Sequence, residues 1–308
     1  MIVIVAPGQG SQAPGFLSPW LEVPAFADAM QSMQEASGID LIGHGTMSDA
    51  DTIRDTAVAQ PLIVSSGVAA LSALFGNSTP AEAGIYGVAG HSVGEITAAV
   101  AAGIFDANQG IKFVRERGSA MARAAALEPT SMAALIGGDL ALVQARLEEL
   151  GLTPANYNGG GQIVAAGSMA AIGELQAHGP EGSRVIPLQV AGAFHTAYMK
   201  PAVASLETFS AAMAVNDPQL PIWSNNAGQL ISSGAEFLKL LVNQVSNPVR
   251  WDLCMESMVA AGVTALIELP PAGTLVGLAK RSMPGIETLA VKTPDNLDAA
   301  LSLINNHR

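Results

Sequence analysis

Cysteine is almost absent from this chain, since Cys254 is the only one among 308 residues. A disulfide within the chain is therefore impossible, and nothing in the cysteine content indicates an oxidising compartment. Cys254 lies among Trp251, Leu253 and Met255, so we expect a small buried thiol. The first apolar run, residues 2–6, has no basic residue before it and is too short for a signal peptide or a membrane span. We therefore predict a cytoplasmic protein with no membrane partner.

Charged residues are also scarce, at 13% of the chain, and most of them are acidic. The 14 Lys and Arg residues stand against 26 Asp and Glu, which gives a formal net charge of -12. No basic run is present that could neutralise phosphates, so the sequence argues against nucleic acid as a partner. Because the protein as a whole is negatively charged, an anionic partner could bind only at a local patch of basic residues.

Histidine occurs only five times, at positions 44, 91, 178, 195 and 307. No pair has the spacing of metal ligands, so we predict no metal site. Hydrophobic residues, by contrast, make up 49% of the chain, which is enough to bury a large core. The length predicts one large domain with a small domain inserted or appended.

The most informative stretch is Gly90-His91-Ser92-Val93-Gly94-Glu95. A serine flanked by glycines, after an apolar run and before an alanine-rich segment, is typical of a nucleophile elbow. A Cβ at Gly90 or Gly94 would collide with the neighbouring backbone of such a tight turn. The start of the helix also directs free backbone N–H groups at an anion beside Ser92. The alternative is an ordinary strand–helix turn with a passive serine.

A competing motif follows the first predicted strand, because Gly8, Gly10 and Ala13 match a dinucleotide-binding fingerprint. That fingerprint requires a second strand that ends in an acidic residue, whereas residues 25–35 have the pattern of a helix. We therefore interpret residues 7–13 as a sharp loop with exposed backbone donors.

The order of elements in residues 1–126 and 191–308 predicts a large α/β domain, because its strands alternate with helices. This alternation is typical of a parallel sheet that is covered on both faces. One helix is expected to open at Gln60-Pro61 and run to Leu74.

A second helix, over residues 107–126, places one charge on an otherwise apolar or small stripe. That charge is Arg117, whereas Arg115 and Arg123 lie off the stripe. Its placement favours a cation at the edge of a pocket, and a planar guanidinium pairs best with a carboxylate. The stripe consists of Gly110, Phe113, Arg117, Met121 and Ala124.

Residues 127–190 have a different pattern, in the order strand, helix, strand, strand, helix, strand. This βαββαβ order is that of a ferredoxin-like unit, so we predict a small α+β domain inserted into the large one. The glycines at positions 159–161 suit the hairpin turn between its middle strands. The expected strands are 132–136, 154–158, 162–166 and 184–190, and the expected helices are 140–150 and 169–177.

A catalytic base for Ser92 is sought among the histidines. His91 is a poor candidate, because adjacent side chains at such a turn diverge. His195, where the chain returns to the large domain, is the best candidate, and a serine that precedes its histidine matches the order in hydrolase-like folds.

Five motifs, in order and spread over most of the chain, together resemble one family, the malonyl-CoA:acyl carrier protein transacylases of fatty acid and polyketide synthesis. The chain length fits a stand-alone enzyme of this family, with a large α/β-hydrolase-like domain and a small ferredoxin-like one. The motifs are Pro7-Gly8-Gln9-Gly10-Ser11-Gln12, Gly90-His91-Ser92-Val93-Gly94-Glu95, Arg117-Gly118 with Met121, Gly192-Ala193-Phe194-His195-Thr196, and Gln244 with Asn247-Pro248-Val249.

The resemblance assigns roles to individual residues. Ser92 is expected to be the nucleophile, with His195 as its base. Backbone N–H groups of Gln9 and Val93 are expected to form the oxyanion hole, and Arg117 to bind the malonyl carboxylate.

The remaining site residues adjoin these groups in the motifs. Gln244 lies in the segment whose backbone carbonyl or amide orients the histidine, and Asp252, close by, is a second candidate for that role. Met121 and Phe194 are expected to contact the substrate. Phe194 resembles the malonyl-selective form of its motif, which leaves little room for an α-methyl group.

The implied reaction moves a malonyl group from malonyl-CoA to the phosphopantetheine thiol of acyl carrier protein, through a malonyl-serine. One thioester replaces another, so we expect no cofactor, and we expect a monomer. Three alternatives stay open: a serine hydrolase or esterase, the transacylase subunit of a malonate decarboxylase, and a docking protein that keeps the fold without catalysis.

Overall fold

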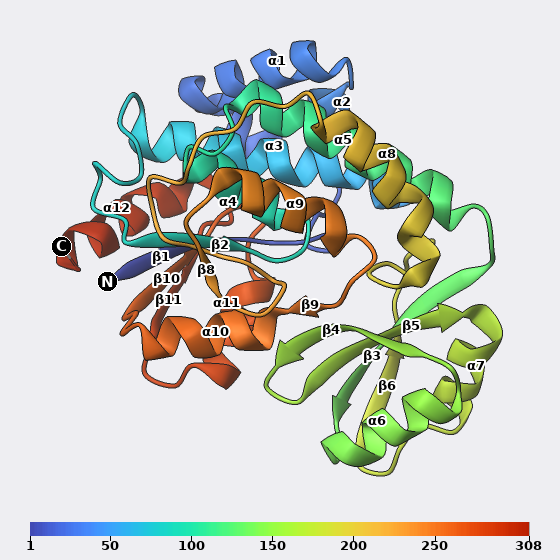
Figure 1. The fold of residues 1–308 in the computed structure, drawn as a ribbon. Coiled ribbons are helices and arrows are strands. Elements are labelled where there is room, and N and C mark those ends of the chain that lie inside the picture. Colours follow the sequence, from blue (N-terminus) through green and yellow to red (C-terminus); the bar gives the residue numbers. More distant parts are fainter. Residues whose placement is uncertain (308) are drawn as a thin grey trace.

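A computed structural model describes residues 1–307, and its centre is a six-stranded sheet (Figure 1). β1 lies between β10 and β2 and runs parallel to both. All five residues of β1 are buried, as its uninterrupted apolar sequence predicts. In spatial order the strands are β11 (Glu287–Ala290), β10 (Ala265–Glu268), β1 (Ile2–Ala6), β2 (Gly87–Gly90), β7 (Ile222–Trp223) and β8 (Leu230–Ile231).

The predicted parallel arrangement is right for five of these strands and wrong for β8, which pairs with β7 in antiparallel register. Only residues 224–229 connect β7 to β8. A parallel connection needs a dozen or more residues, so the short link forces a hairpin.

Helices cover both faces of this sheet, as its strand–helix alternation predicts. In Figure 1, α10 and α11 lie on one side of the sheet, and α1, α3 and α5 lie on the other. The helices of this part are α1 (Pro24–Ser37), α2 (Leu41–Thr46), α3 (Thr56–Phe75), α4 (Gly94–Ala101), α5 (Ala107–Ala125), α8 (Lys200–Ser210), α9 (Gly234–Gln244), α10 (Trp251–Ala260), α11 (Thr274–Ser282) and α12 (Leu297–Asn306).

Helix α3 is the central apolar helix of the core. By length and composition alone it could cross a membrane, but 78% of its most apolar window is buried inside the protein. The predicted start at Gln60 is wrong, since α3 begins four residues earlier, at Thr56. The Asp55 side chain caps this earlier turn by accepting a hydrogen bond from the N–H of Ala57. Pro61 therefore lies inside the helix.

The second sheet contains the four strands predicted for residues 127–190. β3 pairs in antiparallel register with β5 and β6, and β5 pairs with β4. A fifth strand, β9 (Val249–Arg250), joins parallel to β4 from outside this segment. In spatial order the sheet is β6 (Ser183–Pro187), β3 (Thr130–Gly137), β5 (Gln162–Ser168), β4 (Thr153–Gly159) and β9, with helices α6 (Leu140–Glu149) and α7 (Met169–Ala177).

Two details of this sheet can be compared with the sequence. The hairpin between β4 and β5 is confirmed, and Gly159, Gly160 and Gly161 all have positive φ. The predicted end of the last strand at residue 190 is wrong, because β6 ends at Pro187. The chain turns there, and the N–H of Val190 bonds to the carbonyl of Leu188 instead of to a neighbouring strand.

Candidate active site

Ser92 lies at the tight turn between β2 and α4. Its φ is 53°, a left-handed conformation that is uncommon for a residue other than glycine. A Cβ on Gly90 would overlap the backbone of Gly94, and a Cβ on Gly94 would overlap the carbonyl of Ala6. The tight turn predicted from the glycine spacing is confirmed.

His195 faces Ser92 from the loop that leads into α8. The distance from its Nε2 to Ser92 Oγ is 2.8 Å, and its Nδ1 lies 2.8 Å from the backbone carbonyl oxygen of Gln244. A carbonyl oxygen can only accept, so Nδ1 carries the proton and the lone pair of Nε2 points at the serine hydroxyl. His195 also has a positive φ, of 62°, and its N–H bonds to the carbonyl of Val245.

The surroundings keep this imidazole neutral. Burial, and then the positive charge of Arg117, lower the pKa of His195 to about 3. Asp252 does not orient the ring, since its carboxylate pairs with Arg250 at 2.8 Å. The backbone carbonyl of Gln244 holds that position, so a carboxylate third member is excluded at this site.

Arg117 reaches Ser92 from α5 and is completely buried. Its Nη2 lies 3.3 Å from Ser92 Oγ and 2.9 Å from Gln244 Oε1, and its Nη1 lies 2.7 Å from Gln60 Oε1. Burial lowers the pKa of Arg117 to about 10, so the group stays charged at neutral pH.

The predicted stripe on α5 is confirmed, because all five of its residues are buried and both Arg115 and Arg123 are exposed. The guanidinium of Arg117 lies deeper than the pocket edge that the sequence predicts, since the residue is completely buried and does not itself line the cleft beside Ser92. Within residues 1–307 no carboxylate bonds to this guanidinium directly, and its Nε has no partner. In these residues the buried charge therefore has neutral hydrogen-bond partners and no anionic one.

The backbone N–H groups of Gln9 and Val93 adjoin the serine. Gln9 belongs to the loop after β1, and Val93 is the N-cap residue of α4. In the described part of the chain, neither N–H donates a hydrogen bond. Gly8 packs against the elbow so closely that a Cβ there would lie 3.0 Å from the carbonyl oxygen of His91. The sharp loop predicted for residues 7–13 thus lies beside Ser92.

These groups open into a cleft of about 260 Å³ between the two sheets. Met121 and Phe194 line it from the same side as Ser92, while Asn156 and Asn158 line it from β4 of the small sheet. His91 turns away from the serine, as predicted, and its Nε2 lies 2.9 Å from Asn158 Oδ1. Burial lowers the pKa of His91, so it is also neutral.

Three polar residues of this site are not among the residues predicted from the sequence. The side-chain oxygen of Asn225 accepts a hydrogen bond from the Ser92 N–H at 2.8 Å, and Gln60 bonds to Arg117. Glu95, the third, is buried behind Gln244. Only Glu95 carries a signal in the sequence, as the one charge at the start of an alanine-rich helix. Asn225 lies more than a hundred residues from Ser92, and no local pattern connects them.

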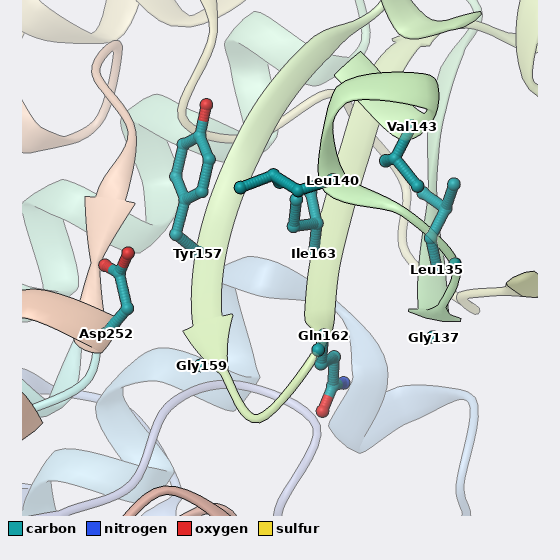
Figure 2. Close-up of a pocket in the computed structure, with 11 residues that line it drawn as sticks. Leu135, Gly137, Leu140, Val143, Tyr157, Gly159, Gln162, Ile163 and Asp252 are labelled. Carbon is teal, nitrogen blue, oxygen red and sulfur yellow. The ribbon is translucent and has the colours of Figure 1, made fainter.

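A second hollow, shown in Figure 2, lies on the opposite face of the small sheet. Leu135, Tyr157 and Ile163 line it, and these alternate along their strands with the residues that face the cleft. Its lining is mostly apolar, and Asp252 at its rim is held by Arg250. No histidine, serine or cysteine is among the residues that line it, whereas His91, Ser92 and His195 line the cleft. In residues 1–307 no three His, Cys, Asp or Glu side chains form a group that could hold a metal ion.

Comparison with known proteins places this geometry in a family. Residues 3–293 match the model of the acyl transferase domain. The malonyl CoA-acyl carrier protein transacylase of Mycobacterium tuberculosis is 46% identical over 98% of this chain and 100% of its own length.

Two solved structures agree with that match. The crystal structure of MCAT from Mycobacterium tuberculosis superposes with a TM-score of 0.93, at 45% identity, over 98% of this chain and 99% of the other. A malonyl-transacylase solved in complex with its type II PKS acyl-carrier protein gives a TM-score of 0.90, at 30% identity, over 98% and 99%. The chain therefore belongs to the acyl transferase domain family, in the group that contains the malonyl CoA-acyl carrier protein transacylases.

Proposed function

We propose that this protein transfers the malonyl group of malonyl-CoA to the phosphopantetheine thiol of an acyl carrier protein, through a malonyl ester on Ser92. One observation carries the proposal: the Ser92 hydroxyl lies between a neutral imidazole at 2.8 Å and a buried guanidinium at 3.3 Å. A base activates the hydroxyl, and a cation selects an acyl group that ends in a carboxylate.

In the first half-reaction, Nε2 of His195 takes the proton of Ser92 as Oγ attacks the thioester carbonyl. The carbonyl oxygen becomes an oxyanion, for which the N–H groups of Gln9 and Val93 are the proposed donors. Each such donor is worth roughly 3 kcal/mol of transition-state stabilisation in comparable sites. The C–S bond then breaks, and His195 returns the proton to the departing CoA sulfur.

The second half-reaction reverses these steps with a new thiol. The phosphopantetheine thiol gives its proton to His195, and its sulfur attacks the malonyl ester. The ester C–O bond breaks, and Ser92 regains its proton. One thioester is lost and one is formed, so we propose that no cofactor takes part.

Selectivity for the malonyl group is assigned to Arg117. Its guanidinium has no carboxylate partner of its own among residues 1–307 and carries a positive charge into a buried site. A malonyl carboxylate satisfies that charge, whereas an acetyl group leaves it without an anion. Phe194 and Met121 bound the same space with apolar surface, and we propose that Phe194 limits substitution at the α-carbon.

For the architecture we propose the finer description that the resemblance implies. The large sheet is assigned to an α/β-hydrolase-like domain, residues 1–126 and 191–308. Residues 127–190 are assigned to a ferredoxin-like domain, and the strand order β6-β3-β5-β4 supports this. A cytoplasmic location and a monomeric state stay predictions from the sequence.

Two alternative functions differ from this one in the molecule that receives the acyl group. A serine hydrolase or esterase on this scaffold transfers the acyl group to water and has no use for Arg117. A malonate decarboxylase transacylase subunit shares the site but loads another carrier. The absence of a carboxylate on His195 Nδ1 and the buried cation beside Ser92 favour the transferase.

The experiment is a malonyl-CoA assay with and without the phosphopantetheinylated acyl carrier protein. We expect CoA release to continue only when the carrier is present, together with malonyl-carrier detected by intact mass. Continuous CoA release with free malonate, and no malonyl-carrier, would instead establish a hydrolase. An unmodified Ser92 after exposure to malonyl-CoA would support the non-catalytic alternative.

A further inference from the structure

Glu95 is a buried carboxylate behind the reactive groups. It lies in the first turn of α4 with 1% of its surface exposed. One carboxylate oxygen accepts the backbone N–H of Asn225 at 2.6 Å, and the other accepts the side-chain NH2 of Gln244. Of the charged and titratable groups around it, Arg117 and Cys254 interact with Glu95 through space, and neither bonds to it.

Glu95 and Asn225 together fix which way the Gln244 side chain points. Both oxygens of Glu95 accept hydrogen bonds from N–H groups, so the NH2 group of Gln244 faces Glu95, and it also donates to the side-chain oxygen of Asn225 at 3.1 Å. The side-chain oxygen of Gln244 then faces the other way, where it accepts from Arg117 Nη2 at 2.9 Å. The orientation of one amide therefore links Glu95 to the guanidinium that adjoins Ser92.

A second branch runs from Glu95 to the nucleophile itself. Asn225, held by Glu95 through its backbone N–H, accepts the Ser92 N–H at 2.8 Å on its side-chain oxygen. Its side-chain NH2 donates to the carbonyl of Gly90 at 2.8 Å. These two bonds brace both ends of a turn in which Ser92 holds a φ of 53°.

Burial of this carboxylate is unfavourable, which argues that it is there for orientation. Desolvation raises the pKa of Glu95 to about 8, although the Asn225 N–H and the charge of Arg117 oppose the rise. A carboxyl group with a pKa this high is largely protonated at neutral pH, so the argument rests on its two oxygens, which each accept from an N–H group. A glutamine at this position is expected to fit the space but to replace one of these two accepting oxygens with an NH2 group.

We propose that Glu95 is a positioning residue that holds the guanidinium of Arg117 and the Ser92 elbow through Gln244 and Asn225, and so sets the preference for a carboxylated acyl group. The inference rests on the function proposed above. In a Glu95→Gln variant, the new NH2 group must face either the NH2 group of Gln244 or the backbone N–H of Asn225, because both oxygens of Glu95 accept from N–H groups. In the first case the Gln244 amide rotates and Arg117 loses an acceptor, and in the second case the support of the Ser92 elbow by Asn225 is weakened.

The test compares Glu95→Gln with Glu268→Gln, a matched change at another buried glutamate. Glu268 accepts backbone N–H groups at the start of α11 and has no bond to this network. For each variant, kcat and KM are measured with malonyl-CoA and acetyl-CoA, and the melting temperature is recorded. We expect Glu95→Gln to lower the malonyl-to-acetyl ratio of kcat/KM by about tenfold or more, and Glu268→Gln to leave the ratio unchanged whatever its stability.

A Glu95→Asp variant keeps the carboxylate and extends the test if Glu95→Gln does not fold. We expect it to retain the malonyl-to-acetyl ratio within about threefold of the parent. The inference is overturned if Glu95→Gln, folded, keeps the parent ratio, or if Glu95→Asp loses the ratio completely. The parent protein, assayed alongside, tests malonyl transfer by itself, so failure of the proposed function is seen separately.

Discussion

The two walls of the cleft differ in what they contribute. Within residues 1–307, the side chains that form hydrogen bonds with Ser92 all come from outside residues 127–190, and they are His195, Arg117 and Asn225. The small sheet contributes a surface, with Asn156 and Asn158 as its polar members. From this difference we infer that reaction and acyl selectivity belong to the wall that contains Ser92, whereas the small sheet shapes access to the site.

The largest effect is expected from Ser92→Ala, which removes the proposed nucleophile. Transfer should fall by about a thousandfold or more, because the acyl-enzyme cannot form. The control is Ser65→Ala, at a buried serine of α3 that bonds only within its own helix. Initial rates of malonyl-carrier formation decide the outcome, and equal rates in the two variants would remove Ser92 from the mechanism.

Arg117→Ala is expected to separate selectivity from reaction. Loss of a buried charged partner costs about 3 kcal/mol, so kcat/KM for malonyl-CoA should fall roughly 100-fold. Activity with acetyl-CoA should rise, because the site no longer holds an unpaired cation. Arg123→Ala, at an exposed arginine of the same helix, serves as the control. An unchanged malonyl preference in Arg117→Ala would break the account.

The pH dependence tests the electrostatics of the same wall. Burial and Arg117 hold the pKa of His195 at about 3, with neutral His91 nearby, so the base stays deprotonated as the pH falls. A histidine with an ordinary pKa near 6.5 would lose about tenfold in kcat/KM between pH 7 and pH 5.5. We expect less than a twofold change over that range. An acid limb with its midpoint near 6.5 would contradict the burial argument.

The lowered pKa of His195 should also make the free energy of unfolding depend on pH. In the unfolded chain the imidazole takes up a proton near its ordinary pKa, whereas the folded chain resists protonation down to about pH 3. This contribution to the free energy of unfolding is therefore present above pH 6.5 and declines as the pH falls from there. Chemical denaturation at several pH values measures it.

A smaller change is expected when space is created beside Ser92 while Arg117 is kept. Phe194→Ser removes a buried ring that lines the cleft. The space should admit an α-methyl group, with a gain of about tenfold in kcat/KM for methylmalonyl-CoA. Malonyl-CoA should still be used, since Arg117 is intact. No gain with methylmalonyl-CoA would mean that another residue limits the α-carbon.

The smallest effect is expected on the opposite wall. Asn156→Ala removes one buried amide of the small sheet. If that wall only shapes access, KM should rise by about fivefold or less and equally for malonyl-CoA and acetyl-CoA. A change in the malonyl-to-acetyl ratio would show that the small sheet takes part in selectivity and would weaken the contrast between the walls.

Local chemistry explains how much of this molecule could be predicted from the sequence. The elbow could be predicted because the tight turn requires glycine at two positions, where a Cβ would overlap the nearby backbone. Arg117 could be predicted because it is the one charged residue on a stripe of apolar or small residues that recur every three or four positions along a helix. Asn225 and Gln60 could not be predicted, because each meets the site only through tertiary contact.

The errors in the fold have the same origin. The reversed strand β8 follows from the length of one short link, and the early start of α3 follows from the cap at Asp55. The fifth strand of the small sheet, β9, comes from a distant segment of only two residues. A strand of two residues is too short to show hydrophobic periodicity, so the sequence could not predict it.

The most direct measurement is the mass of the acylated residue after a brief mixture of the protein with malonyl-CoA, followed by acid quench and digestion. The same mixture is made with Arg117→Ala and with acetyl-CoA. The account predicts one malonyl group on Ser92 in the parent protein, and a loss of malonyl but not of acetyl occupancy in Arg117→Ala. A malonyl group on another residue, or equal malonyl occupancy of Ser92 in both proteins, would contradict it.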